Sequence, residues 1–340
     1  MNAKRKDPNG LLQAGALIEE HQPSLIVTKQ QLRKIDHIET VRASRANRQQ
    51  EFGFAPRPFV LCNFPHKQPK QPSKVYERYN GNFALSIIPN PKYGVPFGKD
   101  RIWPIFLSTV AVRQQSRVIR FRSASEVLDL FELAKGGDQF ERLTAGFKRI
   151  FNSTIVFGLR DDVQQQSLPF VGQNDQGLEV IPEDDQPSFC ADRFHFIDQA
   201  TLWFAQNKCS PNHFRENEIR LSEAFYDEIS AHPIPTDLKA VKALASSPGA
   251  LDLFMWLSYR CYVIQPGGSA QIPLFGPLGL VHHLGSNEYS RPRDFRRQLD
   301  LWLDSVRLLW PGCPARISGG GSYLVLGHGQ ALHSKQALLQ

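Results

Sequence analysis

Residues 290–309 decide the fold, and they read SRPRDFRRQLDLWLDSVRLL. Apolar side chains recur here at steps of four, three, four and three residues, the spacing of one helix face that packs on a core. These side chains are Phe295, Leu299, Trp302, Val306 and Leu309. Ser290 can cap such a helix, and Pro292 suits its first turn. The stretch therefore predicts a long helix with one buried face.

Four arginines occupy the N-terminal half of this predicted helix: Arg291, Arg293, Arg296 and Arg297. The C-terminal half carries Asp300 and Asp304 instead. A planar guanidinium can donate two hydrogen bonds to guanine or to phosphate, so a cluster of them suits DNA. Asp294 fits this less well, because a carboxylate repels phosphate. The alternative reading is an ordinary solvated helix face.

The segments around this helix predict a winged helix-turn-helix. Residues 236–245 and 247–261 have helical patterns, residues 270–272 suit a strand, and residues 277–284 suit a short helix. After the long helix, Gly319-Gly320-Gly321 would turn a two-stranded ribbon. In such a module the N-terminal end of the long helix enters the DNA major groove. On the ribbon, Arg316 and Ser322 would meet phosphate or the minor groove.

The first half of the chain repeats this order less clearly. Helices are expected over residues 101–117, 123–133 and 138–151, and strands over residues 154–159 and 193–204. The helix over residues 138–151 would place Arg142, Lys148 and Arg149 off its apolar stripe, for contact with DNA. Packing or a homodimer contact explains those three cations equally well.

The expected architecture is therefore α+β, with two tandem winged-helix domains. Residues 57–215 would form the first domain, with an acidic mobile loop over residues 161–192, and residues 216–330 the second. Residues 1–56 look like a basic, largely disordered tail, and residues 331–340 like a short C-terminal tail. The Pro- and Lys-rich stretch from Cys62 to Pro72 reads as an exposed connector.

Charge is unevenly distributed along the 340 residues, whose net charge is +7. Residues 1–122 hold 21 Lys/Arg and 8 Asp/Glu, residues 123–228 hold 9 and 19, and residues 229–340 hold 10 and 6. The N-terminal segment is thus strongly basic, the central segment acidic and the C-terminal segment mildly basic. This distribution favours a polyanionic partner that binds only some surfaces of the protein.

The sequence favours no catalytic, cofactor or metal site. The five cysteines form no C-x-x-C pair, which argues against a zinc site or a disulfide framework. The stretch from Gly94 to Lys99 is one residue short of a phosphate-binding loop, and the adjacent His282 and His283 do not have the spacing of a metal-binding pair. No signal-like or membrane-spanning apolar run is present, so we expect a cytoplasmic protein without a membrane partner.

Four phrases add a family resemblance: YERYNG at 76–81, YGVPFG at 93–98, PIPTDL at 233–238 and ALDLFMWLSYR at 250–260. Over about residues 57–330 the chain resembles the bacterial plasmid-encoded RepA replication initiators. The resemblance implies binding to direct repeats (iterons) of origin DNA, opening of adjacent AT-rich DNA, and recruitment of the host initiator and the replicative helicase. It also implies that the protein is not an enzyme. Two alternatives remain: a winged-helix transcriptional repressor, and a DNA-nicking or primase-like enzyme.

Overall fold

The structure is a computed structural model that describes residues 29–81, 83–121, 124–131, 136–159, 191–202, 217–285, 289 and 291–332. Residues 161–190 of the expected acidic loop lie outside the described residues, as does Ser290, the expected cap of the long helix. The loop prediction is corrected at its end, because Ala191 and Asp192 already belong to a strand.

The prediction of a disordered N-terminal tail is wrong for residues 29–56, which form helix α1 (Lys29–Ala46) and strand β1 (Phe52–Pro56). Val41 of α1 is buried, and two arginines of the helix donate hydrogen bonds to carbonyls of distant segments. Arg42 Nε donates to the carbonyl of Leu308 at 2.6 Å, and Arg45 Nη1 donates to the carbonyl of Ala331 at 2.6 Å. The helix therefore docks in part by satisfying one carbonyl at the end of α10 and another near the end of the described chain.

Within the described residues, the first half of the chain continues through twelve helices and strands, of which α3 is the most deeply buried helix. They are α2 (Arg57–Leu61), β2 (Tyr76–Asn80), β3 (Phe83–Ile88), the 3-10 helix η1 (Gly98–Arg101), α3 (Ile102–Gln114), β4 (Val118–Phe121), α4 (Ala124–Leu130), α5 (Gly137–Phe151), β5 (Thr154–Leu159), β6 (Ala191–His195), β7 (Ile197–Thr201) and β8 (Asn217–Leu221). The single strand expected over residues 193–204 is divided at Phe196, whose ring is fully buried.

Two antiparallel sheets organise this half. One has the order β2-β3-β5-β6, in which Phe83 pairs with Leu159 and Ile155 with Phe194. The other has the order β4-β8-β7, and it includes residues 217–221, which lie beyond the expected domain boundary. This second sheet therefore crosses the expected boundary, whereas the first, which spans residues 76–195, does not.

The second half supplies the elements expected around the arginine-bearing helix, together with helix α6 and strand β9. They are α6 (Glu223–Ala231), β9 (Pro233–Asp237), α7 (Leu238–Leu244), α8 (Pro248–Val263), β10 (Ser269–Pro273), α9 (Leu280–His283), α10 (Pro292–Leu309), β11 (Ala315–Ile317) and β12 (Tyr323–Gly327). The α+β class is confirmed, and β10, β12 and β11 form one three-stranded antiparallel sheet in that order.

Strand β9 was not predicted, because Pro233 and Pro235 suggested only the end of a helix. In the structure β9 pairs antiparallel with β1, with Phe54 opposite Pro235. A two-stranded ribbon tolerates proline where no amide donor is needed. Helix α7 accordingly starts later than expected, and Asp237 caps it by accepting from the amides of Lys239 and Ala240.

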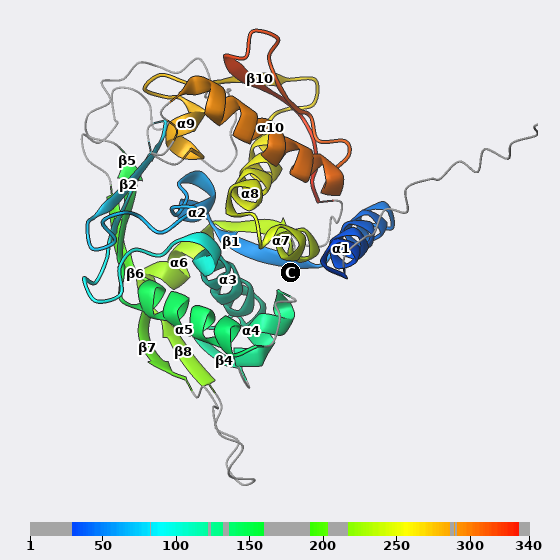
Figure 1. The fold of residues 1–340 in the computed structure, drawn as a ribbon. Helices are drawn as coiled ribbons and strands as arrows, with labels where there is room; N and C mark the ends of the chain where they lie inside the picture. The colour runs from blue at the N-terminus through cyan, green and yellow to red at the C-terminus, as the bar shows by residue number, and fades with distance from the viewer. Residues whose placement is uncertain are drawn as a thin grey trace, which may run out of the picture.

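One continuous set of buried apolar residues runs from Val41 to Ala331. Figure 1 shows α3, α5 and α6 gathered with β7 and β8, while α8, α9, α10 and β10 form the opposite part of the molecule. The β1 strand and α7 lie between these two parts. The expected connector at 62–72 is buried at its start, since the side chains of Cys62 and Phe64 are inaccessible to solvent.

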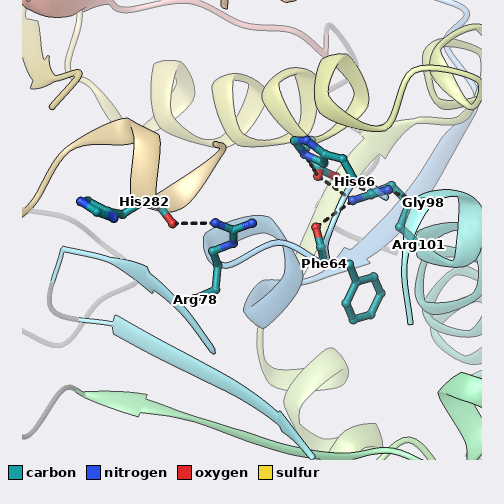
Figure 2. Close-up of polar contacts among 7 residues, drawn as sticks. Phe64, His66, Arg78, Gly98, Arg101 and His282 are labelled. Atoms are coloured by element: carbon teal, nitrogen blue, oxygen red, sulfur yellow. Dashed lines mark hydrogen bonds and ion pairs between the residues drawn. The ribbon is translucent and has the colours of Figure 1, made fainter. Parts of the chain in front are cut away.

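A buried ion pair joins the two parts (Figure 2). Arg101, the last residue of η1, donates from Nε to Asp252 Oδ1 of α8 at 2.7 Å and from Nη2 to Asp252 Oδ2 at 2.9 Å. Arg101 also donates to the carbonyls of Phe64 and Gly98. The ring nitrogen Nε2 of His66 lies 3.2 Å from Asp252 Oδ2, and burial lowers the pKa of this histidine. Each charge is therefore satisfied within the protein.

Replacing Asp252 by alanine should lower the free energy of unfolding by about 3–5 kcal/mol, because it leaves the Arg101 guanidinium buried and unpaired. Urea denaturation would measure this loss. Asp294→Ala, which removes an exposed carboxylate of α10, should change the free energy by no more than about 0.5 kcal/mol. A loss for Asp252→Ala as small as that of the control would show that the pair does not hold the two parts together.

Candidate nucleic-acid interface

Helix α10 has the buried face that its sequence predicts. Phe295, Leu299, Trp302, Val306 and Leu309 are all buried. The helix packs on α8, where a Cβ at Gly249 would lie 2.2 Å from the Trp302 ring. Only glycine permits this approach, so α10 is fixed to the core by close contact. Arg291 is its N-cap residue and makes no side-chain capping bond.

Three of the four predicted arginines project into solvent. Arg291, Arg293 and Arg297 are exposed, and the side chain of Arg293 keeps 82% of its accessible surface. Its Nε lies 4.0 Å from Asp294 Oδ1 of the same turn. An exposed pair at that distance holds neither group firmly. These guanidinium groups are therefore available to a ligand.

Arg296 is placed differently from its three neighbours. Its guanidinium carbon lies 5.4 Å from the centre of the Phe275 ring, and its Nε is buried with no hydrogen-bond partner among the described residues. A Cβ built on Gly321 would lie 3.1 Å from Arg296 Nη1. Gly321, with φ +63°, belongs to the turn of the β11–β12 ribbon. Arg296 therefore packs between α10 and that turn rather than pointing outward.

The ribbon carries the other two candidates of this half. Arg316 of β11 is exposed opposite Val325 of β12, and Ser322 is exposed in the turn before β12. Tyr323 beside it keeps 44% of its surface. The ribbon thus presents polar and aromatic side chains next to the N-terminal half of α10. Whether they touch DNA stays a prediction.

Helix α5 keeps two of its three candidates. Arg142 and Lys148 are exposed, but Arg149 donates from Nε and Nη2 to Asp100 at 2.6 and 2.9 Å. The Arg149 guanidinium also lies 4.6 Å from the centre of the Phe97 ring. The assignment of Arg149 to DNA is therefore corrected: this cation neutralises a buried carboxylate. Nothing in the α5 sequence signals this, because Asp100 is 49 residues away.

Two cysteines and two adjacent histidines of the described residues were candidates for reactive or metal-binding chemistry. Burial raises the pKa of Cys261 to about 12 and that of Cys313 to about 11, which keeps both thiols protonated at neutral pH. His282 is exposed whereas His283 is buried, so the two rings do not face one ligand. Among the described residues, no group of three potential ligands is placed to hold a metal ion.

A helix with one face in the core and exposed arginines at its start, followed by a β ribbon, is a pattern typical of DNA-binding proteins. The sequence family described as plasmid encoded RepA protein matches residues 95–272. This is more than half of the chain, which therefore belongs to that family of replication initiators. Helix α10 and the ribbon lie beyond the matched residues.

The fold was also compared with solved structures. A crystal structure of domains 2 and 3 of RctB, as a SeMet derivative, is similar with a TM-score of 0.49 and 13% identity, over 80% of this chain and 97% of that one. A second crystal structure of RctB domains 2-3 gives a TM-score of 0.44 and 11% identity, over 78% and 94%. No curated protein matches the sequence. Within the described residues, no helix has the length and apolarity needed to cross a membrane.

Replacing Arg296 by alanine should lower the free energy of unfolding by about 1 kcal/mol, since it removes a cation–π contact and the packing of the side-chain stem. The loss should be localised: hydrogen exchange should quicken at the Ser318–Gly321 turn. Arg297→Ala, one residue away and exposed, serves as the matched control and should leave exchange at the turn unchanged. Equal exchange in the two variants would show that Arg296 does not support the ribbon.

Proposed function

We propose that the protein initiates plasmid replication by binding direct repeats (iterons) in origin DNA through two winged-helix units. The main support for this proposal is that α10 has two different faces. Phe295, Leu299 and Trp302 are buried on one face, whereas the side chain of Arg293 is 82% exposed. Family membership supports the initiator role, and the exposed arginines support the mode of binding.

In this proposal the N-terminal half of α10 enters the major groove. Arg291, Arg293 and Arg297 then face base edges or phosphates, and a guanidinium bidentate to guanine would supply sequence preference. Arg316 and Ser322 of the ribbon contact the adjacent backbone. Arg296 fixes the spacing between helix and ribbon without reading a base.

The first unit would add contacts through Arg142 and Lys148 of α5. Binding to several repeats would then help open the adjacent AT-rich DNA and bring the host initiator and the replicative helicase to the origin. A homodimer would serve to repress the protein's own expression. All of this takes place in the bacterial cytoplasm and needs neither a cofactor nor a catalytic step by the protein itself.

Arg293→Ala and Arg297→Ala should each weaken binding to origin repeats by roughly 1–3 kcal/mol if the contact is bidentate to guanine, while binding to scrambled DNA falls much less. Fluorescence anisotropy with both duplexes at several salt concentrations would measure the preference. Arg220→Ala removes an exposed arginine from β8 and is the matched control. Equal weakening on both duplexes would assign these residues to phosphate contacts instead.

The initiator role has its own test in cells. A plasmid that carries the origin but lacks its initiator should replicate when this protein is supplied in trans. Supercoiled origin DNA incubated with the protein and Mg²⁺ should stay intact. Repression without replication would favour a repressor, and a cut at a single site would favour a nicking enzyme.

A further inference from the structure

Two loops of the first half are joined into one surface, which we call the lysine loops: residues 65–75 and residues 89–99. The amide of Val95 donates to the carbonyl of Pro72, and the amide of Gly98 donates to the carbonyl of Pro65, both at 2.9 Å. The first loop lies between α2 and β2, and the second runs from the end of β3 into the first two residues of η1. The proposed contacts of α10, the ribbon and α5 make no use of them.

The lysine loops carry a strong positive charge. Their exposed cations are Lys67, Lys70, Lys74, Lys92 and Lys99. Glu77 is the single acidic residue of the sequence between 65 and 99. Asp100, which follows the second loop, is already neutralised by Arg149. No acidic side chain of the loops themselves can therefore offset the lysines.

The backbone that carries these lysines is ordered by local bonds. Gly94 adopts φ +79°, and a Cβ there would lie 3.0 Å from Pro72 Cβ, so the close approach of the two loops requires glycine. The Asn90 carbonyl accepts from the amide of Gly94 at 2.9 Å, and Asn90 Oδ1 accepts from the amide of Lys92 at 2.9 Å. Such a surface loses little conformational freedom on binding.

The same loops are attached to the part of the molecule that carries the exposed arginines. The His66 ring lies 5.2 Å from the Trp302 ring of α10 at an interplanar angle of 87°. From the adjoining strand β2, Arg78 Nη1 donates to the carbonyl of His282 in α9 at 3.4 Å, as Figure 2 shows. DNA held by α10 would therefore have a second cationic surface fixed to the same frame.

We infer that the lysine loops bind the sugar–phosphate backbone of the DNA that α10 reads. The inference rests on the proposed function. Lysine is a mobile point charge that suits phosphates without choosing among bases, whereas the bidentate geometry of arginine is concentrated on α10. The loops add affinity and position the duplex, and they leave the base preference to α10.

The test removes three lysines together in the full chain: Lys70→Gln, Lys74→Gln and Lys92→Gln. All three are exposed, and an unchanged melting temperature would verify the fold. The matched control removes the same charge from exposed arginines elsewhere, by Arg48→Gln, Arg193→Gln and Arg220→Gln. Binding to an origin-repeat duplex and to a scrambled duplex is measured against salt concentration.

We expect the lysine variant to reduce the slope of log K against log salt by roughly 2–3, about 0.9 for each lost phosphate contact. Affinity for both duplexes should fall by the same factor, so that the ratio between them is kept. The control variant should change the slope much less.

Slopes that do not differ between the two variants would overturn the inference. So would a selective loss of affinity for the repeat duplex, because the lysines would then read bases. Normal DNA binding with failed replication in cells would overturn it in favour of an acidic protein partner. Failure of the proposed function is distinguishable: the wild-type protein would then show no preference for repeats, whatever the lysine variant does to the salt slope.

Discussion

The ion pair between Arg101 and Asp252 is the constraint on which the arrangement of this protein depends. Both side chains are almost fully buried, at 4% and 2% of their accessible surface. Burying two charges is costly, and only a bidentate geometry with further hydrogen bonds compensates for it. Here the guanidinium also reaches the carbonyls of Phe64 and Gly98. All the hydrogen bonds of this ion pair are made in one arrangement of the two parts. Displacement of either part would leave a buried charge unpaired.

The same ion pair is connected, through neighbouring contacts, to both of the cationic surfaces described above. Asp252 lies on α8, and α8 supports α10 through the contact of Gly249 with Trp302. His66, which contacts both Asp252 and Trp302, begins the first lysine loop. The arginines of α10 and the lysines of the loops are thus carried by one frame.

The arginines of the chain have three different roles that their sequence context does not distinguish. Arg293 and Arg297 are exposed at the start of α10. Arg149 and Arg101 neutralise buried carboxylates. Arg42 and Arg45 donate to the carbonyls of Leu308 in α10 and of Ala331, and so help to dock a helix of which Val41 is buried. The same side-chain type is therefore found exposed on a helix, paired in the interior and bonded to carbonyls between segments.

The sequence by itself determined the helices and strands whose periodicity is local, including α10 with its buried face, the ribbon after it, the helices α3, α4 and α5, and strand β5. These follow from spacing within one segment, because a helix or strand repeats its contacts every few residues. Four phrases also determined the family. Only the tertiary structure decided that β9 pairs with β1 and that α1 packs beside α10. It also decided that Arg149 forms an ion pair with Asp100 and that Arg296 packs against the ribbon. Each of these depends on residues far apart in the chain, and no local pattern encodes which distant carboxylate, ring or carbonyl a cation will meet.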